Sequence, residues 1–326
     1  MPHVDAGEAC SIVLKYLPEI PAWPQLPGRS PLEGMGMQFS EGFPGLVMDG
    51  ARLHVEPSSD FEVGLEQIYV DAGEDSTDNY RVSDRYAAGL SAFLSRAAGS
   101  HTVKGQVTGP ITWGLTVTGK DGLGILYDDT LAEAAAGFLR LKASWQEKEL
   151  RRIAPNTIVF VDEPHLVALG SVFTPIPDEK VPGLLREVLG GIKGVRGLHC
   201  CGNSNWSVLL DTGIDILSFD AYNYASSLSA HSDSVRTFLE RGGAIAWGIV
   251  PNDEEALADE SPSGLRDRLE DAMAMFTRDG TKFRQIIARG LITPCCGLAG
   301  LSPLAAERAL ELTATLSRDL RSRYVT

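Results

Sequence analysis

The sequence predicts an α/β protein built as a (β/α)8 TIM barrel with an N-terminal elaboration. From about residue 100 onward, short apolar runs alternate regularly with longer amphipathic stretches, a pattern typical of a parallel sheet with helical crossovers. Glycines end several predicted helices just before the next apolar run, as at Gly190, Gly213 and Gly290. The chain has 326 residues, a length that single-domain α/β barrels commonly reach.

Apolar runs define the predicted strands, and amphipathic stretches define the predicted helices. The strands are Ala22–Gln25, Leu46–Met48, Lys104–Val107, Ile158–Val161, Gly197–Cys200, Ile216–Phe219, Ala244–Ile249 and Leu291–Pro294. The helices are Leu131–Ala154, Val181–Gly190, Trp206–Leu210, Ser232–Arg241, Leu265–Arg278 and Ala305–Arg321. An open doubly wound sheet is the alternative, but it normally carries a G-x-G-x-x-G loop after an early strand, and the sequence has none. We therefore predict one barrel domain over residues 1–326, in which residues 1–100 include a covering N-terminal hairpin or loop segment.

Charge and composition exclude several classes of function. The chain carries 43 acidic and 29 basic residues, a net charge of −14, which argues against nucleic acid or an anionic membrane as a partner. No apolar run approaches the roughly 18 residues of a membrane span. The first residues lack the basic region and apolar core of a signal peptide, so we expect a cytoplasmic protein. The five cysteines form an odd-numbered set, which is a poor disulfide framework.

The motif GLHCCGN, at residues 197–203, contains a possible half of a metal site. His199 and Cys201 are two residues apart, so in an extended segment both side chains lie on one face while Cys200 points away. An imidazole and a thiolate on one face can bind zinc from one side. The alternative is that these are buried strand-end residues with no ligand.

The motif LITPCCGLAG, at residues 291–300, ends another predicted strand with a cysteine in front of Gly297. Because all parallel strands end at the same edge of the sheet, this cysteine can join His199 and Cys201. Catalytic zinc sites characteristically have three protein ligands and one exchangeable position. A redox disulfide is the rival reading, but neither cysteine pair has the C-x-x-C spacing.

Three further strand ends carry polar residues. Asp162 and Glu163 follow one apolar run and can present a carboxylate to an ammonium group, or can cap the next helix. Asp220 follows the strand after His199, where it can be a fourth metal ligand, a hydrogen-bond partner of His199, or a helix cap. Thr108 precedes Gly-Pro, which by itself indicates a sharp turn able to bring backbone near a ligand.

Taken together, these motifs resemble those of a known family. The C-terminal catalytic barrel of cobalamin-independent methionine synthase has similar segments in the same order, as do the related zinc methyltransferases of the uroporphyrinogen-decarboxylase superfamily, which move methyl groups from methylcobalamin to thiols. The segments in this chain are VKGQVTGPIT, FVDEP, HCCGN and PCCGL. The resemblance covers roughly residues 100–300.

The resemblance implies roles for individual residues. His199, Cys201 and Cys296 correspond to the zinc ligands that activate the substrate thiol, and Cys296 is chosen because the family pattern is Cys-Gly-Leu. Asp220 stands where the family has an acidic ligand, usually Glu. Asp162 corresponds to the carboxylate that holds the amino group of homocysteine. Glu163 and Thr108, from the neighbouring motif positions, are expected to bind substrate as well.

Departures from the folate-dependent synthases bear on the methyl donor. Ala168 stands where they have an acid that contacts folate, and residues 246–252 lack their proton-donating histidine. The chain is also too short for their additional N-terminal barrel. We therefore expect zinc as cofactor, homocysteine as acceptor and a methyl-corrinoid (methylcobalamin) as donor, with a corrinoid protein favoured as its carrier. The alternatives are transfer to another thiol, a metal-free enzyme like uroporphyrinogen decarboxylase, and a zinc-binding or corrinoid-binding scaffold without turnover.

Overall fold

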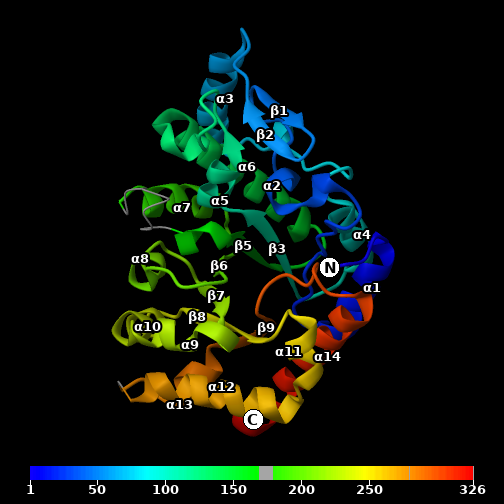
Figure 1. Ribbon diagram of the computed structural model, residues 1–326, viewed down its shortest axis with the longest axis vertical. Helices are drawn as coiled ribbons and strands as arrows, with labels where there is room; N and C mark the ends of the chain where they lie inside the picture. Colours follow the sequence, from blue (N-terminus) through cyan, green and yellow to red (C-terminus); the bar gives the residue numbers. More distant parts are fainter. Residues whose placement is uncertain (169–178, 279, 326) are drawn as a thin grey trace.

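A six-stranded parallel sheet organises the structure (Figure 1). The computed structural model describes residues 1–168, 179–278 and 280–325. The strands of this sheet, in spatial order, are β3 (Thr102–Thr108), β5 (Asn156–Asp162), β6 (Val195–Cys200), β7 (Ile216–Asp220), β8 (Ala244–Val250) and β9 (Gly290–Pro294). Spatial order follows chain order and every neighbouring pair is parallel, so each connection is a crossover.

Helices form these crossovers, a further helix, α14, follows the last strand, and together they cover the outside of the sheet. They are α5 (Pro110–Thr116), α6 (Asp129–Arg151), α7 (Lys180–Gly190), α8 (Trp206–Leu210), α9 (Ala221–Ser229), α10 (Ser232–Glu240), α11 (Glu254–Asp259), α12 (Pro262–Thr277), α13 (Phe283–Ala288) and α14 (Pro303–Tyr324). Side-chain caps start several of them: Asp128 accepts from Leu131 N before α6, and Ser302 accepts from Ala305 N before α14. Within the described ranges, no helix combines the length and apolar character required to cross a membrane.

The two faces of the sheet have different neighbours. Odd-numbered residues of β3 and β5 face the helices, and a Cβ on Gly105 would collide with Gln146 of α6. Even-numbered residues face inward. There, Ile158 and Phe160 of β5 form a small apolar cluster with Ile216 of β7 and Ala246 of β8, and Leu291 of β9 packs against it. Because side chains from such distant strands meet, the sheet is curled around its inner face.

The N-terminal part adds helices and a second, smaller sheet. The helices are α1 (Ala6–Tyr16), α2 (Met35–Gln38), α3 (Phe61–Glu74) and α4 (Ala88–Arg96), and the sheet contains β1 (Leu46–Asp49), β2 (Arg52–Val55) and β4 (Val117–Thr118). Strands β1 and β2 form an antiparallel hairpin that lies, with α3, at the opposite end of the long axis from α12 and α14 (Figure 1). Helix α1 is fixed to α14, because Lys15 Nζ and Tyr16 Oη both donate to Glu307 Oε1, at 2.9 and 2.8 Å.

Two of the predicted strands differ in the structure. Residues 46–48 lie in β1 of the small sheet, where they are half-buried or exposed, and not in the parallel sheet. The segment 22–25 makes only a single parallel bridge, between Ala22 and Lys104 of β3. Pro21 and Pro24 flank this bridge, and proline has no N–H to extend a ladder. The predicted α/β class and parallel sheet are confirmed, but six of the eight predicted strands form that sheet.

A buried carboxylate joins the longest crossover helix to the sheet. Glu147 of α6 accepts hydrogen bonds from Thr157 Oγ1 of β5 at 2.7 Å and from the backbone N–H groups of Lys193 and Gly194, at 2.7 and 2.6 Å, just before β6. Only 2% of this residue is exposed, although Arg151 pairs with it from the solvent side at 3.2 Å. Glu147 therefore ties one helix to two consecutive strands.

Replacement of Glu147 by Ala should lower the free energy of unfolding by about 3 kcal/mol, because it leaves buried donors without a partner. Urea denaturation followed by circular dichroism measures this loss. The matched control is Glu149→Ala on the same helix, which removes only an ion pair with the exposed Arg152 and should cost less than about 1 kcal/mol. Equal losses in the two variants would contradict the anchoring role.

Candidate metal centre

The strand register places four polar residues at one level of the sheet. Thr108 of β3 is paired with Asp162 of β5, Asp162 with His199 of β6, and His199 with Ser218 of β7. All four belong to the inward-facing set of their strands, because successive side chains alternate between faces. At the carboxyl ends of the strands, the inner face of the sheet therefore carries a carboxylate, an imidazole and a hydroxyl on neighbouring strands.

Ser218 orients the imidazole of His199. Its Oγ lies 3.0 Å from His199 Nδ1, and the other ring nitrogen, Nε2, remains as a ligand atom. A hydrogen bond at one ring nitrogen is the usual device that fixes the ring orientation of a metal-binding histidine. Burial lowers the pKa of His199, but the Cys296 thiol and the Asp162 carboxylate outweigh burial and raise it overall. Sequence analysis missed Ser218, although it lies two residues before Asp220 and so on the same strand face.

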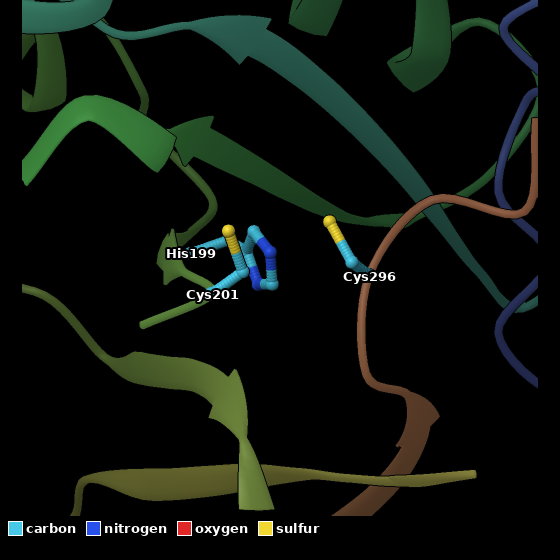
Figure 2. A group of neighbouring side chains, drawn as sticks. All are labelled: His199, Cys201 and Cys296. Atoms are coloured by element: carbon cyan, nitrogen blue, oxygen red, sulfur yellow. The ribbon is translucent and has the colours of Figure 1, made fainter. Parts of the chain in front are cut away.

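Two cysteines complete a cluster with His199 (Figure 2). Cys201 follows the last residue of β6 and Cys296 follows β9 by two residues, so the two thiols approach the imidazole from different chain segments. The ligand atoms of His199, Cys201 and Cys296 all lie within 4.8 Å of one another, and all three residues are half-buried. Tertiary structure therefore brings together the three residues that the sequence predicts as ligands.

The donor set suits zinc. Two thiols and one imidazole are the ligand types found in Cys/His zinc sites, in which neighbouring ligand atoms lie about 3.5–3.8 Å apart, given the Zn–S and Zn–N bond lengths. A hydrogen bond between the thiols lowers the pKa of Cys201 and raises the pKa of Cys296 to about 12. The two thiols of the cluster therefore differ in acidity, Cys201 being the more acidic.

The other member of each cysteine pair faces away. Cys200 Sγ contacts the carbonyl oxygen of Gly202 at 3.7 Å, and Cys295 Sγ donates to the carbonyl oxygen of Gly248 at 3.2 Å. Both residues are buried, and burial raises the pKa of Cys200 to about 11 and also raises that of Cys295. Neither belongs to the cluster of potential ligands.

Asp220 is a helix cap in the structure. It follows on from β7 directly into α9, and its carboxylate accepts from the backbone N–H of Asn223 at 2.9 Å and from Asn223 Nδ2 at 2.7 Å. Both oxygens are thereby turned to the first turn of α9, and Asp220 is not part of the cluster of potential ligands among the residues described. Asp220 therefore has one of the three roles expected for it, that of a helix cap, and Ser218 is the hydrogen-bond partner of His199. Ligation of a metal by Asp220 stays a prediction.

Glu163 and Thr108 have hydrogen-bond partners within the protein, and their contact with substrate stays a prediction. Glu163 accepts from the backbone N–H groups of Ile111 and Thr112, each at 2.8 Å, and from Thr112 Oγ1 at 2.6 Å, at the start of α5. It is fully buried on the outer face, and burial raises its pKa to about 7 against the effect of these donors. Thr108 Oγ1, which is also buried, donates to the carbonyl oxygen of Met35 at 2.7 Å.

Asp162 differs from its neighbour Glu163. It is half-buried, faces inward beside His199, and its carboxylate has no hydrogen bond or ion pair with any residue that the structure describes. Burial raises its pKa, and the positive charges of Lys104 and of protonated His199 oppose this shift. Of the two acids in the motif, Asp162 is the one free to bind a ligand.

Replacement of Asp220 by Ala should lower the free energy of unfolding by about 1–2 kcal/mol, the typical effect of losing an N-cap, without loss of metal. Chemical denaturation and elemental analysis of the same preparation measure the two properties. Asp253→Ala is the matched control, because Asp253 caps α11 by accepting from Ala256 N at 3.0 Å. Metal loss in Asp220→Ala but not in Asp253→Ala would make Asp220 a ligand after all.

Comparisons with known proteins bear on the fold. Neither the protein-family models nor the curated proteins gave a match. Among solved structures, the chain is similar to a protein described as a vitamin-B12-independent methionine synthase from Listeria monocytogenes, with a TM-score of 0.58 and 14% identity over 97% of this chain and 85% of that one. A methyltransferase from Methanosarcina mazei gives a TM-score of 0.59 and 13% identity over 100% and 87% of the two chains. At these identities, the likeness shows that the chain shares its fold with methyltransferase-type proteins.

Proposed function

We propose that this protein is a zinc-dependent methyltransferase that moves a methyl group from a methyl-corrinoid to the thiol of homocysteine and so forms methionine. The observation that carries the proposal is the convergence of His199, Cys201 and Cys296 within 4.8 Å at the carboxyl ends of β6 and β9. The fold likeness to two methyltransferase-type proteins supports it. We also propose that the curled sheet is the main part of a (β/α)8 barrel, completed beside β3 by the segment around Ala22.

Each residue of the site has a separate role in the proposed reaction. His199, Cys201 and Cys296 would hold the ion and leave a fourth position open to the substrate thiol. Zinc in this position would supply Lewis acidity, which lowers the pKa of a coordinated thiol until it loses its proton. Ser218 keeps the His199 ring in its binding orientation through the bond at Nδ1. Asp162 lies beside His199 and its carboxylate has no partner among the residues that the structure describes, so it would accept hydrogen bonds from the ammonium group of the substrate.

Two features of the sequence are consistent with the proposed donor. In the transfer, a new S–C bond forms as the C–Co bond breaks, and the electron pair of the C–Co bond stays on cobalt. The thiol proton passes to solvent, so the leaving group needs no proton from the protein. A folate leaving group does need one. Ala168 and the histidine-free segment 246–252, which stand where the folate-dependent synthases that the sequence resembles have their folate contact and proton donor, are consistent with a corrinoid.

We expect one zinc ion per chain in the purified protein. Cys201→Ser and Cys296→Ser should each lower zinc content well below one, because each removes a thiolate ligand. Cys200→Ser and Cys295→Ser are matched controls that should keep the metal, since both thiols face backbone carbonyls away from the cluster. Elemental analysis after dialysis under reducing conditions gives the answer. Full zinc content in Cys296→Ser, or loss in Cys295→Ser, would show that the wrong neighbour is assigned.

We expect methionine to form from homocysteine with methylcobalamin or a methylated corrinoid protein, and essentially none with methyltetrahydrofolate. Mass spectrometry of the product after incubation with each donor tests this, with Cys201→Ser as the inactive control. Efficient turnover with methyltetrahydrofolate alone would refute the donor. Methyl transfer only to another thiol would replace homocysteine as acceptor. A protein that retains no zinc and transfers no methyl group would favour a metal-free enzyme like uroporphyrinogen decarboxylase.

A further inference from the structure

A lysine lies on the inner face of the sheet beside the candidate metal centre. Lys104 belongs to β3, whose even-numbered residues face inward, and it is half-buried. Its Nζ donates to Gln106 Oε1 at 3.2 Å and lies 4.8 Å from the centroid of the Phe160 ring. Phe160 and Asp162 project from the same face of β5, two residues apart. The ammonium group therefore lies close to Asp162, on the side away from the end of the strand.

An ammonium group on Lys104 and a carboxylate on Asp162 would carry opposite charges, but the two side chains do not form an ion pair. Within the part of the chain that the structure describes, the ammonium group has Gln106 as its hydrogen-bond partner and the carboxylate has none. The two groups nevertheless affect each other's pKa. Burial lowers the pKa of Lys104 and raises the pKa of Asp162, and the charge of each group opposes the shift of the other. The position of the ammonium group over the Phe160 ring places it near Asp162 on the same face of the sheet, but no direct hydrogen bond joins the two side chains.

This separation is costly for the folded protein alone. Removing a charge from water is unfavourable unless a partner of opposite charge or several hydrogen bonds compensate it. A direct ion pair, or two apolar residues, would remove most of that cost. A ligand with one positive and one negative group would remove it as well, by lying between the two side chains.

We propose that Lys104 binds the carboxylate of the thiol substrate while Asp162 binds its ammonium group, so that the site selects a thiol carrying an α-amino acid head group. The inference rests on the proposed function and names the residue that recognises the acidic part of the acceptor. Cys201 and Cys296 lie beyond the ends of β6 and β9, whereas Lys104 and Asp162 lie within β3 and β5. The head group would therefore point into the sheet and the sulfur outward, toward a bulky donor at the open end.

Binding of three thiols to the zinc-loaded protein tests the proposal. Isothermal titration calorimetry is carried out with homocysteine, with 3-aminopropane-1-thiol, which lacks the carboxylate, and with 4-mercaptobutanoate, which lacks the ammonium group. The variants are Lys104→Met, which keeps the aliphatic stem, and Asp162→Asn. Lys148→Met is the matched control, since Lys148 is an exposed lysine of α6 that donates to Thr77. Zinc content and thermal unfolding are measured for each variant.

In Lys104→Met, affinity for homocysteine and 4-mercaptobutanoate should fall roughly 10- to 100-fold, the usual effect of losing a hydrogen bond to a charged group, and affinity for 3-aminopropane-1-thiol should stay within about twofold. Asp162→Asn should weaken the two amines and spare 4-mercaptobutanoate. Lys148→Met should bind like the unmodified protein. In the unmodified protein, removal of the carboxylate from the ligand should cost about as much affinity as removal of Lys104.

Other outcomes separate the possible failures. Equal homocysteine affinity in Lys104→Met and the unmodified protein would overturn the role of Lys104 and leave the proposed methyl transfer intact. An equal loss for all three thiols would mean that Lys104 acts on the metal-bound sulfur or on folding, and not on a carboxylate. Failure of the unmodified zinc protein to bind any of the three thiols would overturn the proposed acceptor together with this inference. If Lys104→Met does not fold, Lys104→Gln, which also removes the charge, replaces it.

Discussion

The register of the parallel strands is the constraint on which the candidate site depends. It sets Asp162, His199 and Ser218 side by side on β5, β6 and β7, at the end of the sheet where the chain leaves each strand. A slip of one residue would turn every one of these side chains to the opposite face. The ladder hydrogen bonds therefore hold the imidazole, its hydroxyl partner and the carboxylate together, and the cysteines reach the same place through short extensions beyond β6 and β9.

Asp162 and Glu163 are adjacent in the sequence but point to opposite faces of the sheet, because strand side chains alternate. Glu163 faces outward and accepts three hydrogen bonds from the start of α5, and Glu147 of α6 likewise accepts bonds from β5 and from the backbone before β6. These outer carboxylates attach helices to strands and are satisfied by the protein itself. Asp162 faces inward, without such partners. The carboxylates that attach helices to strands thus lie on the outer face of the sheet, and the carboxylate available to a ligand lies on the inner face.

The two members of each cysteine pair also have different neighbours. In each pair one thiol contacts a backbone carbonyl, as Cys200 and Cys295 do, while its neighbour reaches the imidazole. Cys201 and Cys296 also share a hydrogen bond that favours a thiolate on Cys201. One thiol of each pair is therefore buried against a backbone carbonyl, and the other belongs to the cluster of potential metal ligands.

Apolar periodicity predicted the α/β class and six strands of the parallel sheet, and the His-x-Cys spacing predicted His199 and Cys201 as a pair. Cys296 was chosen instead from the Cys-Gly-Leu pattern of the family that the sequence resembles. The sequence did not show which carboxylate oxygens and ammonium groups have a hydrogen-bond partner in the folded chain and which do not. Asp220 and Glu163 have the same local pattern as Asp162, yet only the folded chain supplies Asn223 and the first turn of α5 as their partners. Likewise, Pro21 and Pro24 restrict the segment around Ala22 to a single bridge with β3, and this effect exists only once the folded chain brings the segment beside that strand. Lys104 shows this most clearly. In the sequence it is one lysine in an apolar run. It becomes a candidate ligand-binding residue only because the curled sheet brings it close to a carboxylate of the next strand without an ion pair between the two side chains.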